Sequence, residues 1–145
     1  MNNNETYIQM KRRQQAEFNQ FPIKFAFSDE QFEKGIRELG LTPEDTDKVY
    51  KTDGGGFYRR DDAPRLHEMM KRFGEELEAA IAADTTGEGF IYGMFLYELN
   101  NHEFAYTWEL DDTLEALGYT EQDIENNPAL KRGLNKAIEK ISDDA

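Results

Sequence analysis

The sequence predicts an α+β protein that is mainly helical, with a small antiparallel sheet, and that folds as a single compact domain. The first observation is a run of apolar side chains over residues 64–83 that recurs every three or four positions, the period of a helix. The second is a hairpin pattern near 48–60, where two short extended runs flank a glycine-rich turn. The third is the length of 145 residues without cysteine, which suffices for one core without crosslinks.

The predicted domain covers residues 7–141, between a flexible tail at 1–6 and a frayed C-terminus at 142–145. Periodic apolar residues predict helices over 7–18, 28–39, 64–83 and 90–101, and a final helix that begins at Pro128. The segment 90–101 is apolar nearly all round, which predicts a buried central helix, with a strand as the alternative. Alternating apolar residues predict short strands at 21–27 and 103–110.

Capping signals set the predicted helix boundaries. Ser28 and Gln31 form the pattern of a capping box, and Asp111 or Asp112 is placed to cap a short helix that ends at Gly118. The stretches "ELGLTPEDT" at 38–46 and "ALGYTEQDI" at 116–124 share a glycine stop followed by a threonine cap. They predict new helices after Thr42 and Thr120. Shared capping chemistry explains the likeness, with duplication as the alternative.

The stretch "KTDGGGFYRR" at 51–60 raises the question of a phosphate-binding loop. A Walker A loop needs lysine followed by serine or threonine after the last glycine, and Phe57 and Tyr58 stand there instead. The dinucleotide-binding fingerprint is also absent. The glycines at 54–56 therefore predict a hairpin turn, with a ligand-binding loop as the alternative.

Charge is distributed very unevenly along the chain. Residues 73–130 contain no lysine or arginine but hold 14 of the 30 acidic residues and 9 of the 18 aromatic ones, so the remainder, with 16 acids and 17 bases, is nearly neutral. Acidic disordered tails are poor in aromatic residues, so this segment is predicted to be a folded acidic surface. Direct binding to nucleic acid is disfavoured, because phosphate contacts need basic side chains.

No motif in the chain predicts catalysis, a cofactor or a metal. His67 and His102 are the only histidines, and each lacks the second histidine of a zinc-protease motif. An EF-hand starting at Asp45 fails because Tyr50 stands where glycine is required. Neither serine lies in a G-x-S-x-G sequence. We therefore expect a non-enzymatic protein without cofactors.

The start of the chain lacks the apolar core of a signal peptide, and the run at 90–99 is about half the length that spans a bilayer. These features predict a cytoplasmic protein that does not enter membranes. The sequence leaves its oligomeric state open.

The leading functional hypothesis is an interaction protein whose acidic surface binds a basic protein partner. In its sharper form the surface mimics nucleic acid and inhibits a nucleic-acid-binding protein, with aromatic side chains as anchors. In the competing interpretation, the acidity only keeps the protein dispersed. The candidate partner-binding residues are Glu98, Glu103, Trp108, Glu109, Asp111, Asp112, Glu115, Glu121, Asp123 and Glu125.

The alternative hypothesis is a small-molecule or anion-binding domain, or an enzyme. It places Arg59, Arg60 and Arg65 in a cleft between the hairpin and the 64–83 helix, beside the turn at Gly54 and Gly56. Convergence of these three arginines in one pocket is the structural feature that this hypothesis requires.

Four stretches carry a resemblance to a known group of proteins: "FPIKFAFSDEQFEKGIRELGLTPEDTDKVY", "GGGFYRRDDAPRLHEM", "TGEGFIYGMFLYELNNHEF" and "NPALKRGL". Together they cover most of the chain, which resembles an uncharacterised family of small acidic bacterial hypothetical proteins associated with gut bacteria and mobile elements. The family carries no activity to transfer. The resemblance implies an accessory role, such as inhibition of host defence, by association only.

Overall fold

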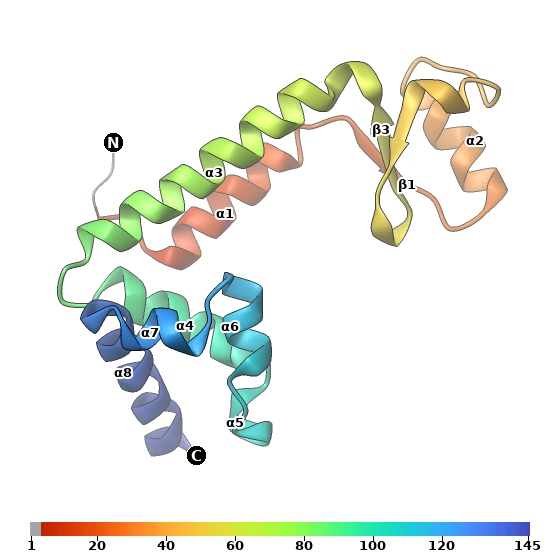
Figure 1. Ribbon diagram of the computed structural model, residues 1–145. Helices are drawn as coiled ribbons and strands as arrows, with labels where there is room; N and C mark the ends of the chain where they lie inside the picture. The colour runs from red at the N-terminus through yellow and green to blue at the C-terminus, as the bar shows by residue number, and fades with distance from the viewer. Residues whose placement is uncertain (1–3) are drawn as a thin grey trace. The chain divides into compact units, whose positions relative to one another are not determined.

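The computed structural model describes residues 4–145 and confirms the α+β class, with dominant helices and one small antiparallel sheet (Figure 1). The backbone contacts divide the chain into two compact units. Of the described residues, unit 1 comprises 4–13 and 76–145, and unit 2 comprises 14–75. The boundaries fall inside the predicted helices α1 (Tyr7–Phe18) and α3 (Ala63–Ala83). Within residues 4–145, no helix is long and apolar enough to cross a membrane.

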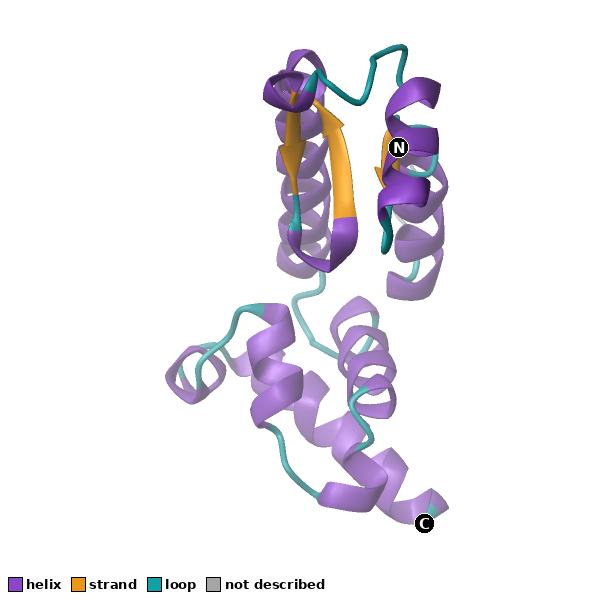
Figure 2. Cartoon of the chain, turned by 90° about the vertical axis from the view of Figure 1, so that its right-hand side faces the viewer, coloured by secondary structure: helices purple, strands orange, loops and turns teal. Residues whose placement is uncertain are grey.

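Unit 2 contains the three-stranded sheet (Figure 2). Its elements run in the order β1 (Ile23–Phe25), α2 (Asp29–Glu38), η1 (Thr46–Lys48), β2 (Val49–Lys51), η2 (Asp53–Gly55), β3 (Gly56–Arg59) and η3 (Arg60–Asp62). The strands are antiparallel in the order β1-β3-β2. The strand predicted at 21–27 is therefore shorter than expected, and Phe27 lies beyond it with 79% of its surface exposed.

The predicted hairpin is confirmed by the pairing of β2 with β3, in which Val49 faces Arg59 and Lys51 faces Phe57. Gly55 lies in the turn with φ +84°, and the Ala26 N–H donates to its carbonyl over 2.9 Å. A Cβ atom on Gly55 would lie 2.7 Å from the Ala26 oxygen. This glycine is thus required both by its left-handed backbone and by its close contact with the chain after β1.

The two faces of the sheet pack against different residues, because successive side chains of β3 point to opposite sides. Phe57 is buried with Ile36 and Leu39 of the α2 segment. Tyr58 is buried with Phe21 and with Met69 of α3. Unit 2 is therefore a thin sheet with a small apolar cluster on each face.

The predicted N-cap of α2 is present, since the Gln31 N–H donates to the Ser28 hydroxyl. The Gln31 side chain reaches back as predicted, but it accepts the Phe27 N–H over 2.7 Å instead of the Ser28 N–H that a capping box uses. At the other end Leu41 N–H donates to the Ile36 carbonyl, which closes the predicted glycine stop.

The helix predicted to begin after Thr42 is wrong. Asp45 does accept the Thr42 N–H over 2.8 Å, but the chain forms a turn and the short η1 instead of an α-helix. The strand β2 begins at Val49, which leaves too few residues for a helix after the glycine stop.

Unit 1 is helical. After the C-terminal part of α3 come α4 (Phe90–Asn101), α5 (Phe104–Thr107), α6 (Asp111–Leu117), α7 (Glu121–Glu125) and α8 (Pro128–Asp144). The strand predicted at 103–110 is wrong, since α5 lies there. The capping box predicted after Thr120 is present, with Asp123 N–H donating to the threonine hydroxyl. Helix α8 extends to Asp144, three residues beyond the predicted end of the domain at Ile141.

The core of unit 1 is built around α4, as predicted for a buried central helix. Its residues Ile91, Met94, Phe95 and Leu99 are fully buried. Helix α8 packs closely on the start of α4 because Gly133 has no side chain. A Cβ atom there would lie 2.5 Å from the Ile91 side chain and 2.6 Å from the Gly87 carbonyl oxygen.

The loop before α4 is held by the carboxylate of Asp84. This carboxylate accepts the N–H groups of Gly87, Gly89 and Ile91 over 2.9–3.1 Å. Gly89 is the N-cap residue of α4 and has no side chain to cap it, so Asp84 takes that role from outside the helix. Burial raises the pKa of Asp84, but the three backbone hydrogen bonds outweigh it and hold the pKa below its usual value.

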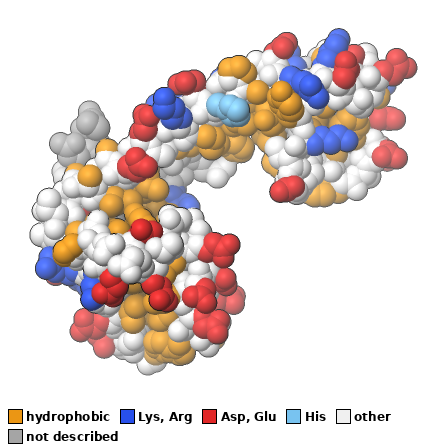
Figure 3. Space-filling view, viewed as in Figure 1, with side chains coloured by type: hydrophobic (Ala, Val, Ile, Leu, Met, Phe, Trp, Pro, Cys, Tyr) orange, Lys and Arg blue, Asp and Glu red, His pale blue; other side chains and the backbone are white. Residues whose placement is uncertain are grey.

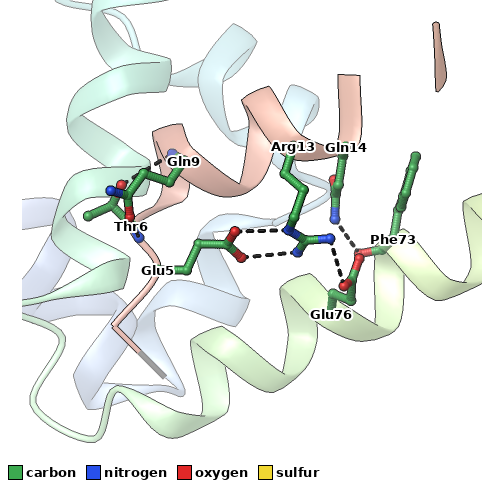
Figure 4. A network of polar contacts seen from close by, with 7 residues as sticks. All are labelled: Glu5, Thr6, Gln9, Arg13, Gln14, Phe73 and Glu76. Atoms are coloured by element: carbon green, nitrogen blue, oxygen red, sulfur yellow. Dashed lines mark hydrogen bonds and ion pairs between the residues drawn. The ribbon is translucent and has the colours of Figure 1, made fainter. Parts of the chain in front are cut away.

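The start of the described chain is fixed by polar contacts within unit 1 (Figure 4). Arg13 makes a two-pronged contact with Glu5, at 2.9 and 3.0 Å, and pairs with Glu76 at 3.0 Å. Thr6 caps α1 by accepting the Gln9 N–H. Residues 1–3 of the predicted tail lie outside the described residues, whereas residues 5 and 6 are held by these contacts.

Replacement of Gly133 by alanine should destabilise the protein by about 1–3 kcal/mol, because the added methyl group overpacks the contact with Ile91. Gly74→Ala in α3 is the matched control, since no neighbouring atom lies within 4 Å of the place that its methyl group would take. It should stabilise by about 0.4–1 kcal/mol through the unfolded state. Urea unfolding of both variants measures the change in the free energy of unfolding. Equal changes in the two variants would contradict the close contact between Gly133 and Ile91.

Replacement of Asp84 by asparagine should cost about 1–3 kcal/mol, because hydrogen bonds to a charged acceptor are lost. The lowered pKa means that this stabilisation is present above the usual carboxyl pKa of about 4 and disappears as the pH falls through the folded-state pKa. Urea midpoints measured from neutral pH into acid should fall less steeply in Asp84→Asn than in wild type. Exposed Asp143→Asn is the control and should follow the wild-type slope.

Candidate interaction surface

Two residues in unusual backbone conformations bracket α5. Glu103 and Trp108 have φ values of 56° and 57°, in the left-handed region that residues other than glycine rarely adopt. Phe104 anchors the segment, since it is 3% exposed and packs edge-on against Trp108 at 5.2 Å between ring centroids. This anchoring leaves Tyr106 86% exposed and Trp108 50% exposed. Trp108 was predicted from the sequence as a partner-binding residue, whereas the exposure of Tyr106 follows from α5, which forms where a strand was predicted.

Five exposed carboxylates lie on and beside α5 and α6. We call them the acidic surface, and they are Glu103, Glu109, Asp111, Asp112 and Glu115. Among residues 4–145, no basic side chain forms an ion pair with any of the five. Figure 3 shows acidic side chains gathered over this part of the chain, next to a hydrophobic patch. Exposed aromatic and unpaired acidic groups thus lie in the same short segment.

The backbone of α6 directs its acids outward. Thr113 and Leu114 are buried, whereas Asp111, Asp112 and Glu115 are exposed. The expected cap by Asp111 or Asp112 is wrong, because Leu110 holds the N-cap position and both aspartates lie in the first turn. Negative charges in the first turn still favour the helix through its dipole. The carboxylates remain free for contacts outside the chain.

The other predicted acids differ in their surroundings. Asp123 is engaged as the partner of Thr120 in the capping box, and Glu125 pairs with Lys131 at 2.8 Å. Glu121 is exposed at the start of α7. Glu98 is 5% exposed and lies in the interior of unit 1. Glu98 is therefore the one predicted acid that the structure buries, and it is not part of the acidic surface.

Glu98 and Tyr7, both buried, form a polar cluster with half-buried Tyr97 and exposed Lys11. The Lys11 ammonium lies 3.8 Å from Glu98 Oε1 and above both tyrosine rings, at 5.3 and 5.6 Å from their centroids. Oε1 is buried and has no hydrogen-bond partner among residues 4–145. Burial raises the pKa of Tyr7, and the negative charge of Glu98 raises it further. No sequence pattern connects these four residues, which meet only in the folded unit.

The three arginines of the alternative hypothesis contact three different partners. Arg59 pairs with Asp62 at 3.2 Å. Arg60 donates to the Val49 carbonyl and lies over the Tyr50 ring, 4.7 Å from its centroid. The Arg65 guanidinium lies over the Phe21 ring at 5.5 Å. A bound anion would have to compete with these contacts, and anion binding stays a prediction.

A cavity of about 450 Å³ borders the glycine turn. Its walls include Gly55 and Gly56 with Phe27, Phe32 and Lys51, so it lies on the α2 side of the hairpin. None of the three arginines lines it. In the part of the chain that the structure describes, no group of three or more histidine or acidic residues could hold a metal ion.

Tyr7→Phe should destabilise the protein by about 1–3 kcal/mol, because it removes a hydroxyl beside the buried Glu98 carboxylate. The raised pKa of Tyr7 means that wild type keeps this contribution below the usual tyrosine pKa of about 10 and loses it as the pH rises further. Guanidinium unfolding across that alkaline range should show a shallower decline for Tyr7→Phe. Tyr106→Phe, at an exposed position, should behave like wild type; identical alkaline slopes in all three proteins would contradict the buried cluster.

Comparison with known proteins finds one relationship. Residues 6–140 match the profile of a family of unknown function, DUF7659. No curated protein and no solved structure matches the chain. The match covers nearly the whole chain, including both units and the acidic surface, and it agrees with the expected resemblance to an uncharacterised family. The chain therefore belongs to the DUF7659 family of unknown function.

Proposed function

We propose that this protein is a non-enzymatic interaction protein whose acidic surface binds a basic protein partner. The observation that carries the proposal is the group of five exposed carboxylates that make no ion pair within residues 4–145, in the same segment as exposed Tyr106 and Trp108. Unpaired charges can attract an oppositely charged partner, and aromatic side chains commonly supply most of the binding energy at an interface.

The backbone of α5 supports the same proposal. Each left-handed residue that is not glycine costs about 1–2 kcal/mol, and two of them flank this four-residue helix. Such conformations cluster at functional sites, where they hold side chains in fixed positions. A fixed Trp108 loses less conformational entropy on binding than a mobile one.

The narrower form of the proposal is that the surface imitates nucleic acid and inhibits a nucleic-acid-binding protein. It is supported by the absence of lysine and arginine from residues 73–130, the stretch of sequence that contains the five carboxylates. The resemblance to bacterial proteins from gut organisms and mobile elements suggests a defence system as the target. The proposal thus includes mimicry of nucleic acid and a defence system as the target. It also includes a cytoplasmic location.

Reversal of the five carboxylates of the acidic surface to lysine should abolish capture of the partner from an extract of the source organism. The charge attraction becomes repulsion, and the five positions are exposed, so the reversal costs stability mainly through the two first-turn acids of α6, at about 0.3–1 kcal/mol each. Affinity capture followed by mass spectrometry, at low and at raised salt, measures the loss. Circular dichroism and thermal unfolding establish that the variant is folded.

A matched control carries the same charge change on unit 2. It reverses five exposed acids there, namely Glu30, Glu33, Glu44, Asp47 and Asp61. This control should retain the basic partner. Equal capture by wild type and both variants would refute the proposal that the acidic surface binds the partner. Equal loss of capture in both variants would show that the net charge, and not this surface, determines binding.

A further inference from the structure

An apolar groove lies beside the acidic surface, entirely within unit 1. Leu110 and Leu114 from the α6 segment, Ile124 of α7, and Leu134 and Ile138 of α8 line it. Leu114, Ile124 and Leu134 are each 5% exposed and contribute to the core of the unit. The groove has a volume of about 230 Å³.

The size of the groove restricts its occupant. Pockets for small molecules and cofactors usually measure about 300–1,000 Å³ and combine apolar walls with several convergent polar groups. This groove is smaller, and its lining is largely apolar apart from the rim. It therefore suits an apolar side chain from another protein better than a cofactor.

The charge at the rim restricts the occupant further. Glu121 stands there without an ion pair among the described residues, and the Glu125 charge is balanced by Lys131. On α6, Asp111 directly follows Leu110 and Glu115 directly follows Leu114. Each acid is therefore turned by about 100° around the helix axis from a leucine that lines the groove. The groove thus opens among negative charges, which favour a positively charged segment.

A second copy of this chain would be repelled. The net charge of the chain is -13, and the basic residues on α8 near the groove already have intrachain contacts. Lys131 pairs with Glu125, Arg132 donates to the Thr86 carbonyl at 2.9 Å, and the Lys136 ammonium lies 4.6 Å from the centre of the Tyr92 ring.

We infer that the groove receives an apolar side chain of a cationic amphipathic segment, whose basic residues contact Glu121 and the acidic surface. This inference rests on the proposed function and adds the kind of partner that the surface recognises. Apolar anchors that enter a pocket, surrounded by polar contacts, are a common arrangement at protein interfaces.

The test uses two synthetic peptides of equal length and equal positive charge. One carries leucines at helical spacing between lysines, and the other has serines at those positions. Fluorescence anisotropy with the full chain should show at least about tenfold tighter binding of the leucine peptide, since partial burial of one leucine suffices for that ratio.

Asn135→Trp is the informative variant, because Asn135 is exposed on α8 and lines the groove. The added ring should cover the groove and reduce the preference for the leucine peptide to about onefold, with binding of the serine peptide unchanged. Asn100→Trp is the matched control, at an exposed position of α4 outside the groove. It should keep the wild-type preference.

The outcomes separate the two proposals. Equal binding of both peptides by wild type would overturn the inference that the groove receives an apolar side chain. An undiminished preference of Asn135→Trp for the leucine peptide would overturn it as well. If binding of both peptides is nevertheless lost on reversal of the acidic surface, the proposed function stands. If reversal of the five carboxylates to lysine leaves the binding of both peptides unchanged, the result counts against both proposals. A dimer in sedimentation that Asn135→Trp dissociates would make a second copy the occupant and refute the cationic segment.

Discussion

The arrangement of unit 1 depends on how α4 is held. This helix is apolar on nearly every side and has no capping side chain at its own N-terminus. Asp84 supplies the missing acceptor for its first N–H groups, and Gly133 lets α8 pack against its first turn. Once both contacts are made, the side chains of α4 are enclosed by the surrounding helices. The short helices α5, α6 and α7 then need only one or two buried residues each to stay in place.

The small number of buried residues in these short helices explains why unit 1 has so many exposed acidic residues without a basic partner. Short helices that are anchored by single residues such as Phe104 and Ile124 leave most of their positions in solvent. Those positions carry acids, and residues 73–130 offer no base to balance them. The bases of α8 contact Glu125, Thr86 and Tyr92. The carboxylates of the acidic surface therefore remain available to a partner.

Elements that carry their own boundary signals could be predicted from sequence. Ser28 and Thr120 cap the helices that follow them, and the Asp84 loop separates α3 from α4 as expected. The error at 103–110 arose because alternate aromatic residues imitate a strand. In unit 1 the same residues form α5, with Phe104 buried and Tyr106 exposed. The error after Thr42 has a different cause, since a cap cannot start a helix where the chain must soon enter β2.

The sequence by itself determined the helical periodicity, the hairpin turn and the segment in which the acids gather, because these depend on residues a few positions apart. Only the tertiary structure decided what each acid does. Glu98 is buried beside Lys11, Glu125 is paired with Lys131, and Glu115 is exposed. These three carboxylates look alike in the chain. Their differences arise from contacts with other helices, because burial and pairing depend on what lies nearby in space.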